Sequence, residues 1–69
     1  MEDLTEKQEE VLAFIKAHIK DVGWPPTRIE ICDYFNWSSP NSAQRHLELL
    51  ENKGVIAVNK NVSRGIKVL

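Results

Sequence analysis

The central segment of the chain, residues 27–53, has the sequence TRIEICDYFNWSSPNSAQRHLELLENK and predicts two short helices joined by a tight turn. Its first part predicts a short helix, because Thr27 and Glu30 have the spacing of a capping box, in which each side chain satisfies a backbone N–H at the helix start. The apolar positions expected on this helix are Ile29, Ile31, Cys32 and Phe35. Asn36 tolerates the left-handed backbone that ends many helices, so we expect the chain to turn there.

A second helix is expected directly after this turn. Ser39 and Pro40 are favoured at the N-cap and the first helical position, and Gly54 is favoured just beyond a helix end. Helical spacing predicts one buried apolar stripe, formed by Ala43, Leu47 and Leu50. The opposite stripe is polar and contains Asn41, Gln44, Arg45 and Glu48. Asn, Gln and Arg can form bidentate hydrogen bonds with base edges, so this pattern is typical of a DNA-reading helix-turn-helix, although many solvated helices carry the same residue types.

The residues on either side complete the predicted fold. One more helix is expected to begin at Thr5, with Gln8 as its capping-box partner, and to end at the run Gly23-Trp24-Pro25-Pro26. Beyond Gly54, residues 55–58 and 64–68 predict two short strands joined by a polar turn. Three helices and a β-hairpin make a winged helix-turn-helix, a mainly α fold with a small β-hairpin, in a single domain over residues 1–69.

The hairpin has two possible roles. It could simply cover the open end of a three-helix core. Because Lys60 and Arg64 lie at or near its tip, we prefer the interpretation that it is a wing contacting DNA phosphates.

Composition excludes several classes of protein. A chain of 69 residues with 42% hydrophobic and 28% charged residues is one ordinary globular domain with a small core. No apolar run is long enough to span a membrane, and the acidic first residues do not form a signal peptide. The single cysteine cannot form an internal disulfide or a multi-cysteine zinc site. We therefore expect a reducing, cytoplasmic location and no membrane partner.

The net charge of −1 argues weakly against a nucleic-acid partner, but the charge is unevenly placed. Five of the ten acids are in the first ten residues, namely Glu2, Asp3, Glu6, Glu9 and Glu10. Residues 37–69 contain five bases and two acids, a net charge of +3. The proposed reading helix therefore lies in the basic half, although random scatter of charge could produce the same excess.

Together these features resemble the N-terminal DNA-binding domain of the LexA repressors, over the whole chain. The most specific runs are PPTR at 25–28, KGVI at 53–56 and SRGI at 63–66. Further matches are Leu4-Thr5, Gln8, Gly23, Glu30-Ile31, Ser39-Pro40-Asn41, Ala43 and His46-Leu47. The resemblance implies a repressor of transcription that binds inverted-repeat operators as a dimer, in a bacterium or phage and in the SOS response.

The reading helix departs from the LexA pattern. The positions of Gln44 and Arg45 commonly hold carboxylates in LexA-like helices. Ser42 replaces a small apolar residue, and Asn52 replaces a basic one beside Lys53. A carboxylate accepts from cytosine, Gln suits adenine and Arg suits guanine, so the binding mode is retained while the operator sequence is expected to differ.

Two groups of DNA contacts are predicted. Base readout is assigned to Ser39, Asn41, Ser42, Gln44 and Arg45. Backbone contact is assigned to Thr27, Arg28, Lys53, Lys60 and Arg64. Asn41 is the first choice as a base reader. Arg45 is the candidate for guanine, but it could also contact phosphate or pair with Glu48 or Glu51, and any single member could be an ordinary surface residue.

Other reactive residues are assigned structural roles. Cys32 is expected to be a small buried residue and not a nucleophile. His18 and His46 lack metal-ligand spacing, and His46 is expected to pack between helices. Trp24 and Trp37 could stack on single-stranded bases, but beside turns they are expected to cover edges of the core. No enzymatic activity, cofactor, metal or small-molecule ligand is expected.

One alternative function stays open. LexA repressors carry a self-cleaving, dimerising C-terminal peptidase domain, whereas this chain ends at Leu69, so it is either an excised domain or a complete small protein. The expected partner is a double-stranded DNA operator, with a possible homodimer on DNA. The alternative is a protein-interaction module that antagonises or modifies a full-length repressor, which would suit the acidic N-terminal turn and the missing dimerisation domain.

Overall fold

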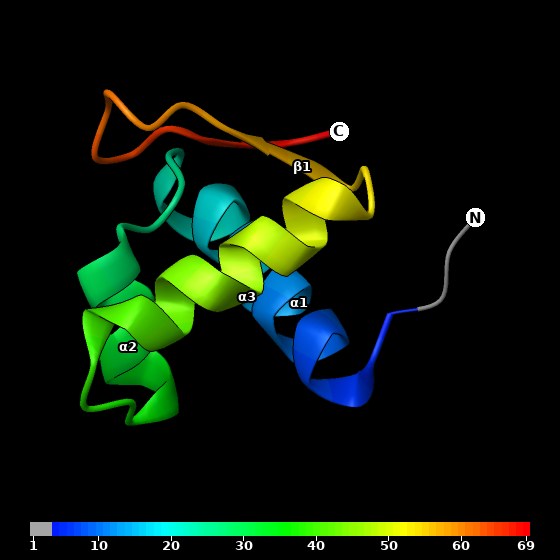
Figure 1. The fold of residues 1–69 in the computed structure, drawn as a ribbon. Helices are drawn as coiled ribbons and strands as arrows, with labels where there is room; N and C mark the ends of the chain where they lie inside the picture. The colour runs from blue at the N-terminus through cyan, green and yellow to red at the C-terminus, as the bar shows by residue number, and fades with distance from the viewer. Residues whose placement is uncertain (1–3) are drawn as a thin grey trace.

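The computed structural model describes residues 4–69 and contains three helices followed by a hairpin (Figure 1). The elements are α1 (Glu6–Val22), α2 (Arg28–Phe35), α3 (Pro40–Asn52), β1 (Ile56–Val58) and β2 (Ile66–Val68). The predicted winged helix-turn-helix is therefore confirmed. Glu2 and Asp3, two of the acids counted at the start of the chain, lie outside the described residues. None of the helices within residues 4–69 combines the length and the apolar character needed to cross a bilayer.

Both predicted capping boxes are present at the helix starts. In α1, the Gln8 N–H donates to Thr5 Oγ1 at 3.1 Å, and the Thr5 N–H donates to Gln8 Oε1 at 3.0 Å. In α2, the Glu30 N–H donates to Thr27 Oγ1 at 3.1 Å, and the Thr27 N–H donates to Glu30 Oε1 at 2.9 Å. These pairs satisfy N–H groups that have no partner within the helix, so they determine where each helix begins.

The helix ends also follow the sequence. Asn36 ends α2 with a φ of 58°, and the Trp37 N–H reaches back to the Cys32 carbonyl at 2.9 Å. Gly54 follows α3 with a φ of 79°, in the left-handed region that favours glycine. This pattern of backward hydrogen bonds closes each helix and redirects the chain, first into α3 and then toward β1.

The core lies where the three helices meet the hairpin. Its buried side chains are Val11, Ile15, Ile31, Cys32, Ala43, Leu47, Leu50, Ile56 and Ile66. The predicted apolar stripe of α3 is therefore confirmed. The prediction for Ile29 was wrong, because this side chain is 65% exposed. At 3.6 residues per turn Ile29 lies about 200° around the helix from Ile31, and α2 buries only the side that carries Ile31.

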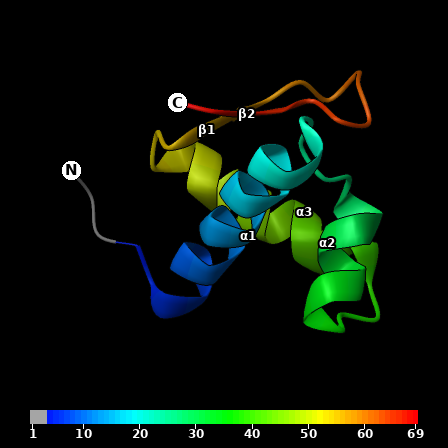
Figure 2. The ribbon, with the colours of Figure 1, turned by 180° about the vertical axis from the view of Figure 1, so that it is seen from behind.

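The hairpin is antiparallel, with Ile56 opposite Val68 and Val58 opposite Ile66. Both strands are shorter than predicted, since Val55 lies in the bend after α3 and residues 64 and 65 belong to a compact tip. In this tip, residues 59–65, the Asn59 N–H donates to the Gly65 carbonyl at 2.8 Å. A Cβ atom on Gly65 would lie 2.4 Å from the Asn59 carbonyl oxygen, so this close approach requires glycine. Both views show the hairpin lying across the helices, with its tip beside the loop between α1 and α2 (Figures 1 and 2).

Candidate nucleic-acid interface

The polar stripe of α3 faces away from the core. Asn41, Arg45 and Glu48 are exposed and Gln44 is half-buried, whereas Ala43, Leu47 and Leu50 on the other side are buried. The start of the helix is set by Ser39, whose Oγ accepts a hydrogen bond from the Asn41 N–H at 3.2 Å, with Pro40 as the first helical residue. Local capping and the buried stripe therefore determine together which side chains α3 presents to solvent.

The predicted base-reading residues occupy different environments. Ser39 and Ser42 are half-buried at the start of α3, and the Ser39 hydroxyl is engaged as the N-cap. Asn41 and Arg45 are exposed. Within residues 4–69, Arg45 forms no hydrogen bond or ion pair, so its guanidinium keeps all its donors for a ligand. In this described part of the chain Arg45 pairs with neither Glu48 nor Glu51, whose carboxylates instead accept from Gln44 and from the Val58 N–H of β1.

The Gln44 side chain is held by neighbours at both of its polar atoms. Arg28 Nη1 donates to Gln44 Oε1 at 2.7 Å, and Gln44 Nε2 donates to Glu48 Oε2 at 3.2 Å. Arg28 is the first residue of α2, so this contact spans the helix-turn-helix. Local sequence patterns do not indicate this contact, because the two residues are 16 positions apart. The only sequence feature pointing to this contact is a long cationic side chain, Arg28, at the start of one helix and an amide side chain, Gln44, near the start of the next.

The predicted backbone contacts are spread over α2, α3 and the hairpin. Thr27 caps α2 and its hydroxyl accepts from Glu30, while Arg28 follows it with an exposed side chain. Lys53 is half-buried at the C-terminal end of α3, and Lys60 is exposed at the hairpin tip. Of these residues, Arg28 contacts the polar stripe of α3, through Gln44, and the contacts of all five predicted residues with DNA stay predictions.

Arg64 has a structural partner that the sequence did not indicate. Its Nη1 and Nη2 donate to Glu30 Oε1 and Oε2 at 2.8 and 2.9 Å, and Nη1 also donates to the Pro25 carbonyl at 2.9 Å. The hydrogen bonds from Arg64 and from the Thr27 N–H lower the pKa of Glu30 to about 2. Arg64 therefore joins the hairpin to the start of α2, and a phosphate contact could use only its remaining N–H groups.

The residues assigned structural roles lie mostly as expected. Cys32 is buried and its Sγ–H donates to the Ser39 carbonyl at 3.4 Å. His46 stacks on Trp37 with ring centroids 4.5 Å apart, and its Nδ1 donates to the Ser42 carbonyl at 2.8 Å. It therefore packs as a structural residue, but against the turn between α2 and α3 and not against another helix. The expectation for Trp24 was wrong, because this side chain is 52% exposed beside Arg64 and does not cover the core. No cluster of potential metal ligands occurs in residues 4–69.

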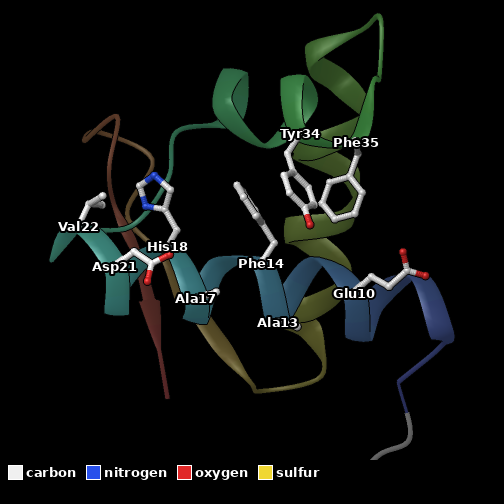
Figure 3. A pocket seen from close by; sticks show the side chains of 9 residues that line it. All are labelled: Glu10, Ala13, Phe14, Ala17, His18, Asp21, Val22, Tyr34 and Phe35. Carbon is white, nitrogen blue, oxygen red and sulfur yellow. The ribbon is translucent and has the colours of Figure 1, made fainter.

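A separate apolar groove lies between α1 and α2 (Figure 3). It has a volume of about 570 Å³ and is lined by Glu10, Ala13, Phe14, Ala17, His18, Asp21, Val22, Tyr34 and Phe35. Tyr34 and Phe35 of α2 point toward α1, where Phe14 stacks on Tyr34 with ring centroids 4.2 Å apart. Because its lining comes from α1 and α2, the groove is distinct from the polar stripe of α3.

A helix-turn-helix with a solvent-facing polar second helix and a basic hairpin defines the winged-helix class of DNA-binding domains. Within this class, the chain belongs to the LexA DNA-binding domain family, whose pattern it matches over residues 1–65. It is 48% identical over 69 residues to the LexA repressor of Histophilus somni and 47% identical over 68 residues to that of Thiobacillus denitrificans. The corresponding value for Pseudomonas aeruginosa LexA repressor is 46% over 68 residues. The alignments cover 99–100% of this chain but only 33–34% of these relatives.

Proposed function

We propose that this domain binds double-stranded DNA sequence-specifically and serves as the operator-reading part of a transcriptional repressor. The observation that carries the proposal is the two-sided character of α3. On one side of the helix Ala43 and Leu50 are fully buried, while on the other side Asn41 and Arg45 are exposed to solvent. Membership of the LexA DNA-binding domain family supports the same function.

In this proposal α3 lies in the major groove, with its N-terminal half against the base edges. Asn41 reads a base through its amide, and Arg45 donates to the two acceptors of a guanine. Lys60 reaches a phosphate from the hairpin tip, and the start of α2 lies beside the other rim of the groove. Base contacts supply the specificity, while phosphate contacts supply most of the salt-dependent affinity.

The operator is proposed to be an inverted repeat occupied by two copies of the domain. One copy on one half-site should bind weakly, with a Kd on the order of micromolar to tens of micromolar, because a second copy roughly doubles the binding free energy. Linking two copies, or joining the domain to a dimerising segment, should therefore raise the affinity for a complete operator steeply.

Selection of preferred sites from random duplexes tests the proposal. A defined half-site should emerge, and Asn41→Ala should cost about 1–3 kcal/mol and relax the preference at one base pair. The matched control is Asn61→Ala in the hairpin tip, which should leave the selected sequence unchanged. Recovery of no preferred sequence, or affinity that stays flat between low and physiological salt, would overturn the proposal.

The groove between α1 and α2 is the surface that the alternative function, a protein-interaction module, would use. Tyr34→Ala removes an exposed wall of this groove without touching α3. If DNA binding is the function of the domain, this variant should bind duplexes as the parent does. Tight binding to a full-length repressor that is lost in Tyr34→Ala, without any affinity for duplex DNA, would favour the alternative.

A further inference from the structure

We propose that Arg28 and Glu48 are positioning residues that hold the Gln44 amide in the orientation that reads an adenine. The inference rests on the proposed DNA-binding function and adds to it the base that Gln44 recognises. The observation behind it is that the Gln44 side chain is bonded on both of its polar atoms, to Arg28 at 2.7 Å and to Glu48 at 3.2 Å.

The chemistry of the two partners leaves one orientation of the amide. A guanidinium can only donate hydrogen bonds and a carboxylate can only accept them. The Gln44 oxygen must therefore face Arg28 and its NH₂ group must face Glu48. An amide turned by 180° would place two donors against each other at Arg28 and two acceptors against each other at Glu48.

The partners also determine what remains free for a ligand. An amide oxygen has two lone pairs and an amide NH₂ has two N–H groups, and Arg28 and Glu48 take one of each. Gln44 is left with one acceptor and one donor on neighbouring atoms. The major-groove edge of adenine offers the complement, an N6 donor and an N7 acceptor.

The other bases cannot satisfy this pair. Guanine presents two acceptors, so its O6 or N7 would meet the Gln44 oxygen. Cytosine presents a donor without a neighbouring acceptor, and thymine presents an acceptor and a methyl group. An unrestrained glutamine could rotate to present both of its N–H groups to guanine, but the restrained amide of Gln44 has one free N–H and cannot present both without breaking its bond to Glu48.

Glu48 itself supports the inference. An exposed carboxylate on the stripe that faces DNA repels phosphates, so its presence weakens nonspecific binding. A role in holding Gln44 explains why an acid lies there. The same role explains why Arg28, which has a long exposed side chain at the start of α2, points across the turn to α3.

The test compares affinities for four duplexes that differ only at the base pair where Gln44→Ala abolishes the preference of the parent domain. The parent should prefer adenine there by on the order of tenfold to a hundredfold. In Glu48→Ala this preference should fall to about threefold or less, although overall affinity is unchanged or higher because a negative charge is removed. Glu48→Gln should retain most of the preference, since its side-chain oxygen still accepts from Gln44. Asp33→Ala, which removes an exposed acid of α2, is the control that should leave the preference intact.

Arg28→Ala separates positioning from a simple phosphate contact. The inference predicts that it reduces the adenine preference, whereas a phosphate contact alone would weaken all four duplexes equally. Each preference is a ratio of two affinities from one preparation, so a partly unfolded fraction cancels. A Glu48→Ala domain that keeps the full adenine preference would overturn the inference and leave the proposed function standing. A parent domain without sequence preference on any duplex would overturn both.

Discussion

Arg64 in the hairpin tip and Glu30 in α2 form a two-pronged ion pair, with N–O distances of 2.8 and 2.9 Å, although 34 positions separate them in the chain. Glu30 also accepts the Thr27 N–H at 2.9 Å, so one carboxylate both caps α2 and holds the hairpin. The position of the wing relative to the helix-turn-helix therefore depends on a charged contact at the start of α2.

The ion pair predicts a dependence of stability on pH. The pKa of Glu30 is lowered from an ordinary value of 4.5 to about 2, so its contribution is present above pH 4.5 and is lost as the pH falls toward 2. We expect Glu30→Gln to melt at a lower temperature than the parent at pH 7, with a difference that shrinks over this acid range. Gln can still serve in the capping box, as Gln8 does in α1, so the substitution keeps the cap and removes the charge that Glu30 presents to Arg64 and to His18, whose Nε2 lies 3.8 Å away. Calorimetry at several pH values checks this, and a difference that is independent of pH would contradict it.

The N-cap of α3 predicts a local contribution to stability. Ser39→Ala removes the acceptor of the Asn41 N–H and should lower the free energy of unfolding by about 1 kcal/mol. Ser38→Ala, one position earlier and exposed, is the control and should have little effect. Urea denaturation measures both. Equal stability of the two variants would show that Ser39 does not hold the start of α3.

Truncating a leucine on the buried side of α3 should destabilise the domain more than truncating one on its exposed side. Leu47 is 3% exposed, so Leu47→Ala should lower the free energy of unfolding by about 2–5 kcal/mol. Leu49 on the same helix is 39% exposed, and Leu49→Ala should cost about 1 kcal/mol or less. Thermal melts of both variants test this, because a small domain is only marginally stable and a loss of this size lowers its melting temperature measurably. Similar losses would mean that α3 is rotated about its axis relative to the structure.

We predict that Lys60 in the hairpin tip contacts a DNA phosphate and therefore does not distinguish one DNA sequence from another. Lys60→Ala should weaken binding to every duplex by about the same factor and reduce the slope of log affinity against log salt by about 1. Lys16→Ala removes an exposed lysine of α1 and is the matched control. Affinities measured over a range of salt concentrations distinguish the two. An unchanged slope in Lys60→Ala would remove this lysine from the DNA contacts.

Local sequence chemistry is sufficient to predict the short-range features of this domain. The capping boxes at Thr5 and Thr27, the left-handed residue Asn36 and the buried stripe of α3 were all predicted. The capping boxes and the stripe depend on residues three or four positions apart, which helix geometry brings together whatever the rest of the chain does, and the turn at Asn36 depends on that residue's own tolerance of left-handed backbone. The family motifs then identified the class of domain, since Pro-Pro-Thr-Arg and Lys-Gly-Val-Ile mark the same turns that the local chemistry predicts.

The contacts between helices and hairpin, in contrast, follow from packing and not from local sequence. The exposure of Ile29 depended on which side of α2 meets the core, and the engagement of Arg64 by Glu30 depended on where the hairpin tip lies. The same holds for Gln44, whose amide is oriented by Arg28 from another helix. Long side chains have many rotamers, and which one is occupied depends on partners brought close only when the helices and hairpin pack. Sequence patterns therefore predict which side chains lie on the candidate DNA surface. Packing of the helices and hairpin determines which of these side chains are bonded to neighbours and which keep their hydrogen-bonding groups free for a ligand.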